Sequence, residues 1–444
     1  MNIALFFDTT TIICGAAVII LAVLSSLMNP FFRFLPSYDE EEEPEEDSDN
    51  TNSEQNTVSE GNEALKASDA EGEAPLEIKD NQEEENTNAN DQEASSLPKL
   101  TVILTPHEEA EKLEQHLPEI LHQDYPAGYQ VIVVTEYGAH DTLDVLKRFK
   151  HSMETEPDAY PNVSLYVTYI PNSSRYMSRK RLAMTLGVKA AQTQWVVFIE
   201  SDSTPSSHQW LQHIGKACTM PDTKMVIGYG HFEPETPATW RFDRLHAACY
   251  LLREDVKGTA YRTLSHTVAI QKDEFMQNDG FEGSLSLVRG EYECLVNKYA
   301  EKGMTQVVTH PKAIMTDDNP TKRAWRSRRL FYVATRRHLN RSVTHRMLFL
   351  TDQVLLHLNV WAILGVALWG ALAQKWVMLG AAILAFILTV ILRLCGAHRA
   401  FSRLREPLSL WAVLPLELTV VWRRLGTAVR YLFASPYDFT THKQ

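Results

Sequence analysis

The sequence predicts an α/β domain held between membrane-spanning helices. Long apolar stretches lie near both ends of the 444-residue chain, and the region between them alternates short β-rich runs with segments of helical spacing. An acidic stretch without aromatic residues separates the first apolar stretch from this region. The expected divisions are a transmembrane anchor (1–37), an acidic disordered linker (38–97), the α/β domain (98–345), a transmembrane hairpin (346–395) and a membrane-associated C-terminal segment (396–444).

The first apolar stretch, residues 11–28, is uncharged and long enough to cross a bilayer at about 1.5 Å per residue. A cleaved signal peptide is the rival interpretation. No Lys or Arg precedes the stretch and no small-residue cleavage site is evident, which favours an anchor.

Two further apolar stretches, 353–374 and 376–392, are separated only by Lys375, which predicts a tight transmembrane hairpin. The segment 321–346 before the hairpin holds nine Lys or Arg and no acid, and the segment that follows is also basic. By the positive-inside tendency both flanks, and the α/β domain with them, are expected in the cytoplasm. The last amphipathic stretch, 408–433, is expected to lie at the interface, with a further crossing as the alternative.

The linker carries the acidity of the whole chain. Residues 39–97 hold 22 Asp or Glu against two Lys, whereas the formal charge of the full chain is −13, so the remainder is net positive. Such a segment cannot bury enough apolar surface to offset the entropy of ordering, and a solvated tether is expected rather than a tail for basic partners. The five cysteines show no C-x-x-C pair, which argues against disulfides and a thiolate metal site.

The α/β region predicts four strands in order, each followed by polar residues. The strands are "LTVILTP", "YQVIVVTE", "VSLYVTYI" and "WVVFIES", and the helices between them are "EAEKLEQHLPEILHQ", "HDTLDVLKRFK" and "SRKRLAMTLGVKAAQ". Ligands gather beyond the carboxyl ends of strands in such sheets. Here those ends read "TPHEE", "TEYGAHDT" and "ESDS".

Glu200 and Asp202 follow the fourth strand at an i, i+2 spacing, so both carboxylates point to one side of an extended segment. Two carboxylates so placed repel unless a cation or hydrogen-bond donors hold them together. A divalent metal site is one interpretation. A polar turn that caps the next helix is the other.

The order of these motifs resembles the family 2 glycosyltransferases of GT-A fold over roughly residues 98–340. The first strand ends in Thr105-Pro106-His107-Glu108 where Asn-Glu is more usual, and "VVTEYGAHDT" resembles the family's V-V-D-D-G-S-x-D-x-T. A basic helix start resembles the family's "GK...AL..G...A" segment, and Glu200-Ser201-Asp202 resembles its D-x-D. The resemblance implies a donor site formed by Thr105, Pro106, Glu108, Glu136, Asp141, Lys180, Arg181 and Glu200.

The later motifs are variants. Gly290-Glu291 matches the family's G-E-D-x-E-L, but Tyr292 stands where the family places the Asp that is its usual general base. Glu291 and Glu293 are the substitutes, and because they lie about 200° apart on a helix, only one of them, preferably Glu291, is expected to face the cleft. The segment 322–332 is similar to the Q-x-x-R-W helix beside the acceptor, which implies an acceptor or phosphate side formed by Trp325, Arg326 and Arg329.

Each assignment has a plainer alternative. Glu108 and Glu136 can be solvated loop carboxylates, Lys180 and Arg181 an ordinary first turn, and the two glutamates a solvated helix face. Most charges of the basic segment 322–346 are expected to face lipid headgroups. The pair Asp317-Asp318 is explained by a turn before Pro320.

The resemblance implies a membrane-anchored enzyme that moves a sugar, with inversion, from a nucleotide-diphosphate donor to a lipid-linked or membrane-proximal glycan acceptor. Mg²⁺ or Mn²⁺, held by Asp202 with Glu200, is the expected cofactor. The expected location is the inner or plasma membrane, with membrane lipid but no nucleic acid as a partner. A pseudoenzyme that serves as a membrane scaffold is the main rival, supported by the altered motifs, and a processive synthase is a third interpretation.

Overall fold

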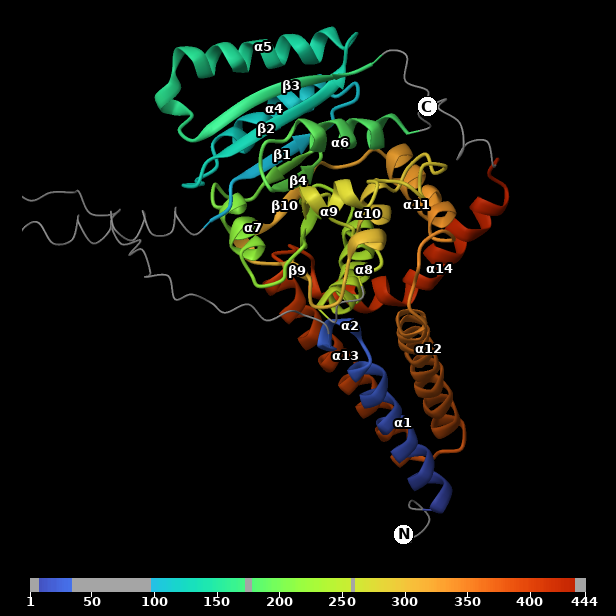
Figure 1. Ribbon diagram of the computed structural model, residues 1–444. Coiled ribbons are helices and arrows are strands. Elements are labelled where there is room, and N and C mark those ends of the chain that lie inside the picture. Colours follow the sequence, from blue (N-terminus) through green and yellow to red (C-terminus); the bar gives the residue numbers. More distant parts are fainter. Residues whose placement is uncertain (1–7, 34–96, 172–177, 257–259, 436–444) are drawn as a thin grey trace, which may run out of the picture.

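The computed structural model describes residues 8–33, 97–171, 178–256 and 260–435, and places a mixed α/β domain on a stem of three long helices (Figure 1). The predicted linker lies, apart from Leu97, outside the described residues.

A seven-stranded sheet forms the centre of the domain, in the spatial order β3-β2-β1-β4-β8-β6-β9. Strand β8 is antiparallel to both of its neighbours, and the other adjacent strands are parallel. A second sheet of three strands has the order β5-β10-β7. The strands are β1 (Leu100–Leu104), β2 (Tyr129–Glu136), β3 (Val163–Ile170), β4 (Trp195–Ile199), β5 (Ser203–Pro205), β6 (Met225–Gly228), β7 (Gly230–Phe232), β8 (Val268–Gln271), β9 (Thr305–Val308) and β10 (Met315–Asp317).

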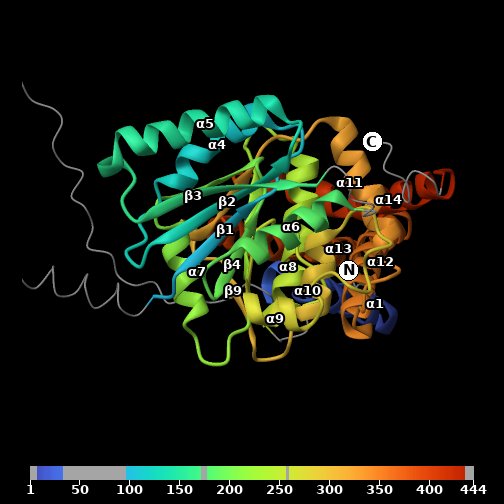
Figure 2. The ribbon, with the colours of Figure 1, turned by 45° about the horizontal axis from the view of Figure 1, so that its top comes forward.

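Helices cover both faces of the large sheet (Figure 2). Val102 and Leu104 of β1 pack against α4 and α7, whereas Ile103 between them packs on the opposite face, against α6. Strands β1 and β4 are buried along their whole length, as strands covered on both faces should be. The helices of the domain are α4 (Ala110–Leu121), α5 (His140–Thr155), α6 (Arg179–Ala190), α7 (Trp210–Cys218), α8 (Ala238–Val256), α9 (Lys272–Gln277), α10 (Glu291–Tyr299) and α11 (Lys322–Thr335), with 3₁₀ turns at Pro157–Ala159 and Pro311–Ala313.

The first four strands and the three helices between them are confirmed at the predicted places. These elements could be predicted because their signals are local. Apolar residues recur every two residues in the strands and about every 3.6 residues in the helices, and polar turn residues flank each element.

The stem consists of α1 (Thr9–Leu27), α12 (Val343–Leu372) and α13 (Trp376–Arg403), each long and apolar enough to cross a membrane. Small residues let these helices approach closely, for Ala22 packs with Ala382 and Ala385 in one apolar cluster. The tight hairpin at Lys375 is confirmed. Helix α12 begins ten residues before the predicted span, so the basic end of the preceding segment belongs to it.

A buried ion pair joins the stem to the C-terminal segment. The Arg393 guanidinium on α13 donates to Glu417 on α14 (Val413–Leu432) at 2.5 Å and to the Ser25 carbonyl on α1 at 2.9 Å. Arg393 and Glu417 are almost fully buried. Helix α14 is thereby fixed against the stem, and a 3₁₀ turn at Leu410–Ala412 precedes it. It is not among the helices apolar enough to span, so the interfacial position predicted for it stays a prediction.

The domain also rests directly on the stem. Tyr250 of α8 donates to Asp352 of α12 at 3.0 Å. The short helix α2 (Pro30–Arg33) inserts Phe31 between Phe242 of α8 and Phe401 of α13, with ring centroids 6.0 and 6.2 Å away. These contacts orient the carboxyl ends of the strands relative to α12 and α14.

Candidate active site

A cavity of about 1410 Å³ lies between the carboxyl ends of the central strands and helices α10, α11, α12 and α14. It is large enough for a nucleotide-sized ligand, since small-molecule sites commonly span about 300–1,000 Å³. The loops after β1, β2 and β4 line one side. This confirms that side chains at those three strand ends converge.

Glu200 and Asp202 face this cavity, and each is held by a cation. Lys180, near the start of α6, donates to Glu200. Asp202 Oδ2 accepts from Arg328 of α11 at 3.0 Å and lies 3.6 Å from Lys112 of α4. Asp202 Oδ1 is buried and has no hydrogen-bond partner. The two carboxylates therefore sit in a site built for charge balance, not in a solvated turn.

The loop after β1 places Glu109 in the cavity wall, and the sequence did not predict this residue for the site. Glu108, the predicted contact, lines the cavity edge but is exposed and has a left-handed backbone, with φ of 55°. That conformation turns Glu109 inward, where its carboxylate accepts from Ser201. Burial, and then the charges of Asp202 and Glu200, raise the pKa of Glu109. The only available signal in the sequence was the second Glu of "TPHEE".

Glu136 lies at the end of β2 as predicted and lines the cavity. It accepts from Arg179 at 2.6 Å and lies 3.4 Å from His107. Thr105 and Pro106 also line the cavity. Asp141 is different: it is exposed in the first turn of α5 and is not part of the cavity wall. The structure therefore does not bring Asp141 to the cavity with the other predicted donor residues, because α5 runs along the outer face of the sheet.

Lys180 and Arg181 point in different directions, because adjacent helical residues are rotated by about 100°. Lys180 lines the cavity, but Arg181 is only 1% exposed and lies outside it. The Arg181 guanidinium donates to the carbonyls of Leu287 and Arg289, the latter at 3.2 Å. Arg181 therefore supports the loop before α10, and the structure does not bring it to the cavity wall where the predicted donor contact would be made.

The N-terminus of α10 brings both candidate bases to the cavity. Gly290, with φ of 88°, precedes Glu291, and a Cβ there would meet Thr335 at 2.9 Å. Glu291 accepts from Ser178 at 3.1 Å, while Glu293 lies toward Arg262. The expectation that only one glutamate faces the cleft was wrong. Both lie in the first turn, so their long side chains reach the cavity from the end of the helix.

Burial raises the pKa of Glu293, against the opposing charge of Arg262. Tyr292, at the variant position, is buried beneath Glu200. Burial, and then the charges of Glu200 and Glu291, raise the pKa of Tyr292. The phenol is thus neutral and cannot replace the missing carboxylate as a base at neutral pH.

Helix α11 presents Trp325, Arg328 and Arg329 to the cavity. Trp325 stacks on Trp240 at 5.2 Å between ring centroids, and Arg329 donates to Asp243 at 2.9 Å. Arg326 is exposed and does not line the cavity, so the structure does not bring it together with Trp325 and Arg329 there. The i, i+3 and i+4 spacing from Trp325 could have identified Arg328.

Asp317 and Asp318 do more than form a turn. Asp317 ends β10 and accepts from Arg244 at 2.7 Å and from Ser203 at 2.6 Å, with His266 Nδ1 at 3.2 Å. Asp318 lies 3.2 Å from Lys112. The explanation by a turn was wrong for Asp317, because that residue holds the small sheet behind the "ESDS" loop.

A divalent cation fits this site with few protein ligands. Among residues 8–33, 97–171, 178–256 and 260–435, no group of three or more His, Cys, Asp or Glu has ligand spacing. The buried Oδ1 of Asp202 is nonetheless an acceptor that lacks a partner, with Glu200 and Glu109 nearby. Mg²⁺ often takes one or two carboxylates, with phosphate and water completing its shell.

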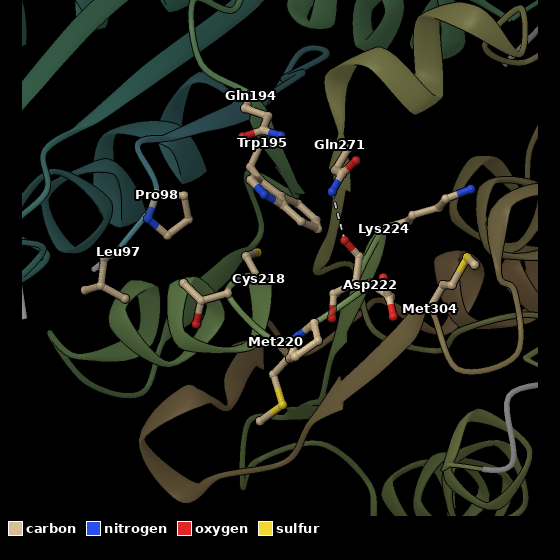
Figure 3. Close-up of a pocket in the computed structure, with 13 residues that line it drawn as sticks. Leu97, Pro98, Gln194, Trp195, Cys218, Met220, Asp222, Lys224, Gln271 and Met304 are labelled. Atoms are coloured by element: carbon tan, nitrogen blue, oxygen red, sulfur yellow. Dashed lines mark hydrogen bonds between the residues drawn. The ribbon is translucent and has the colours of Figure 1, made fainter. Parts of the chain in front are cut away.

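A second cavity, of about 560 Å³, lies at the amino ends of the strands (Figure 3). Pro98 precedes β1, Gln194 precedes β4, and Gln271 donates to the Thr223 carbonyl at 2.8 Å. It lies at the sheet edge opposite the carboxylates described above. It therefore does not belong to the candidate active site.

No protein-family model matches the chain, and no curated protein matches it. Among solved structures, the mannosyltransferase PcManGT from Pyrobaculum calidifontis, in complex with GDP-Man and Mn²⁺, is 17% identical and has a TM-score of 0.43, covering 75% of this chain and 88% of that one. Residues 1–349 of TarS from S. aureus are 16% identical, with a TM-score of 0.39 over 73% of this chain and 92% of that one. The same TarS fragment in complex with UDP is 14% identical, with a TM-score of 0.38 over 73% and 92%.

The buried Asp317 predicts a pH-dependent contribution to stability. Burial alone would raise its pKa, but Arg244 and then His266 lower it well below its usual value. The unfolded state then binds the proton more readily, so Asp317 stabilises the fold above about pH 4, and this contribution is lost as the pH falls toward the folded-state pKa. Asp317→Asn should lower the free energy of unfolding by about 3–5 kcal/mol at neutral pH.

Asp318→Asn is the matched control and should cost less, because Asp318 is 19% exposed against 2% for Asp317. Thermal unfolding of both variants at pH 7 and at about pH 2 measures the difference, because the contribution of Asp317 should fall only below about pH 4. Equal losses for the two variants at pH 7, or a larger loss for Asp317→Asn at about pH 2 than at pH 7, would contradict this account.

Proposed function

We propose that this chain is a membrane-anchored glycosyltransferase of the GT-A, family 2 type. The observation that carries the proposal is the balanced charge at the end of β4. Two carboxylates and the cations Lys180 and Arg328 face one nucleotide-sized cavity, and Lys112 lies 3.6 Å from Asp202. Such an arrangement suits a nucleoside diphosphate, which needs positive charge for its phosphates and hydrogen-bond acceptors for its ribose.

In this proposal the donor lies over the strand ends, with its nucleoside beside Glu136 and its diphosphate next to Lys180 and Arg328. The acceptor hydroxyl attacks the anomeric carbon as the bond to the diphosphate breaks, which inverts the configuration. Arg328 and Lys180 stabilise the negative charge that develops on the leaving diphosphate. A Mg²⁺ or Mn²⁺ ion held at Asp202 Oδ1 would supply further neutralisation when bound.

We assign the proton transfer to Glu293 in preference to Glu291. Glu291 accepts from Ser178 beside Lys180, on the donor side, whereas Glu293 lies toward Arg262, on the side of α11 and α12. A raised pKa also makes the ionised carboxylate of Glu293 a stronger base, because a general base works best when its pKa is near the cellular pH. The acceptor, a glycan or glycolipid near the membrane, would enter from that side.

A catalytically impaired scaffold remains the second candidate function. Tyr292 in place of an acid favours it, since the buried phenol is neutral. In that case the cavity would bind a nucleotide without turnover. A transferase requires Glu293 as a base, whereas a scaffold does not.

Nucleotide binding tests the donor site. Nucleoside diphosphates should bind the full chain in detergent, and Mn²⁺ should strengthen the binding. Asp202→Asn should weaken Mn²⁺-dependent binding by about tenfold to a hundredfold, because charge-assisted contacts are lost. Calorimetric titration with and without Mn²⁺ measures this effect.

Asp141→Asn, which neutralises an exposed Asp outside the cavity, should leave nucleotide affinity unchanged. If no nucleoside diphosphate binds the wild-type chain, the proposed donor site is wrong. Equal effects of the two substitutions would also reject it.

The assignment of the base predicts that Glu293→Gln lowers kcat by about 10²- to 10⁴-fold and leaves donor affinity nearly intact. Glu291→Gln should have a smaller effect on kcat. Turnover and donor binding, measured together for both variants, separate the two positions. A larger loss for Glu291→Gln would move the base to that residue, and a nucleotide-binding protein without any turnover would favour the scaffold.

We also propose that the domain faces the cytoplasm, where sugar nucleotides are made, because basic segments flank the apolar hairpin. Protease added to intact cells should then leave the acidic segment uncut, and opened cells should allow cleavage within residues 39–97. Cleavage in intact cells would reverse the orientation.

A further inference from the structure

The end of the cavity nearest the stem is lined by three arginines that come from distant parts of the chain. Arg262 precedes β8, Arg341 precedes α12, and Arg424 lies on α14. We call these three residues the stem-side arginine cluster. All three lie close enough to Tyr332 of α11 for their charges to act on its phenol.

Among the described residues, no carboxylate forms a direct ion pair with the cluster, although the charge of Glu293 acts on Arg262 and that of Asp243 acts on Arg424. Within the part of the chain that the structure describes, no Asp or Glu oxygen lies within 4.0 Å of Arg262, Arg341 or Arg424. Asp243, which lines the same region, is occupied by Arg329 at 2.9 Å and by Arg423 at 2.6 Å. Three guanidinium groups without a direct carboxylate partner are costly in such a confined place, so the cluster favours a bound anion.

Aromatic rings hold the guanidinium groups in place. The Arg262 guanidinium lies 3.7 Å from the centroid of the Tyr332 ring, and the Arg424 guanidinium lies 3.9 Å from that of Phe349. A guanidinium stacked on its face keeps its edge N–H groups available for a ligand. Arg262 is 8% exposed, and its Nε, like that of Arg341, is buried without a hydrogen-bond partner.

The local potential is positive. Burial lowers the pKa of Arg424, and the neighbouring Arg262 adds to this effect against the opposing charge of Asp243. Burial would raise the pKa of Tyr332, but the charge of Arg262, a hydrogen bond with Tyr261, and the charges of Arg341 and Arg424 together outweigh burial, and the net pKa is lowered. The lowered pKa of Tyr332 indicates that negative charge is favoured beside the cluster.

The cluster opens beside a membrane-spanning helix. Phe349 and Leu350 of α12, on the second turn of that helix, line the same end of the cavity. Leu350 is 55% exposed, and Figure 1 shows α12 leaving the domain beneath α11 and α14. An amphiphile could place its head among the arginines and its tail along the apolar surface of α12.

We infer that the stem-side arginine cluster binds the phosphate group of an amphiphile at the bilayer surface. Glu293, the proposed base, lies beside Arg262, so an amphiphile bound at the cluster could be the acceptor. That role as acceptor rests on the proposed function. The phosphate site itself does not depend on it. Three guanidinium groups, two of them stacked on aromatic rings, suit a phosphate monoester or diphosphate, which accepts several charge-assisted hydrogen bonds at once.

Dihexanoyl phosphatidic acid, a soluble phosphate monoester with two short tails, is the probe. It should bind the full chain saturably in an uncharged detergent, whereas dihexanoylglycerol, which lacks the phosphate, should not. Arg262→Gln and, separately, Arg424→Gln should each weaken binding by about tenfold to a hundredfold. Two variants on different elements, checked by thermal unfolding, guard against a loss that reflects misfolding.

Arg326→Gln is the matched control, since Arg326 is an exposed arginine of α11 outside the cavity. If Arg326→Gln weakens binding as much as Arg262→Gln, the attraction is a general surface effect and the inference fails. Absence of saturable binding also overturns it. Displacement of the probe by inorganic phosphate would support a site that the head alone can fill, and lack of displacement would support a site that needs the tails as well.

The same samples separate this inference from the proposed function. Nucleoside diphosphate binding should survive Arg262→Gln, and binding of the probe should survive Asp202→Asn. Probe binding without nucleotide binding would reject the donor site alone, and the reverse result would reject the phosphate site alone.

Discussion

The buried guanidinium of Arg393 determines how the α/β domain sits on its membrane helices. A cation in this apolar setting is tolerated only when it is paired and hydrogen-bonded. Arg393 satisfies this condition through Glu417 on α14 and Ser25 on α1, with Asp352 of α12 at 3.7 Å. Four helices must assemble before the charge is compensated. The ion pair therefore ties the first and last parts of the chain to one arrangement, although alone it is weak evidence for stability.

That arrangement completes the cavity. The strand ends supply Glu109, Glu200 and Asp202, but the opposite wall comes from α11, α12 and α14. Without the stem the carboxylates would lie in an open cleft, and Arg424 would be far from Arg262. The same cavity thus holds the charge-balanced strand ends, where we propose that a diphosphate binds, and the stem-side arginine cluster, where we propose that the phosphate of an amphiphile binds.

Local sequence was a good guide wherever a residue lies next to the element that positions it. Glu200, Asp202 and Glu136 follow buried strands, and parallel strands end at one edge of the sheet, so their convergence could be predicted. Lys180 could be placed because it opens the helix before the fourth strand. The sequence predicted less well which of two neighbouring residues faces the site. The left-handed backbone of Glu108 leaves that residue exposed, and Glu109 points inward instead. On α6, Lys180 faces the cavity, whereas the next residue, Arg181, is buried outside it.

The sequence by itself determined the first four strands, the three helices between them, the three apolar spans and the acidic residues at the strand ends, because each depends on patterns within some twenty residues. Only the tertiary structure decided which charges meet. Arg328 and Asp202 are separated by 126 positions, and Arg393 and Ser25 by 368. Such partners are selected by the electrostatic cost of leaving a charge unpaired in the folded interior, and that cost is a property of the packed molecule, not of any segment.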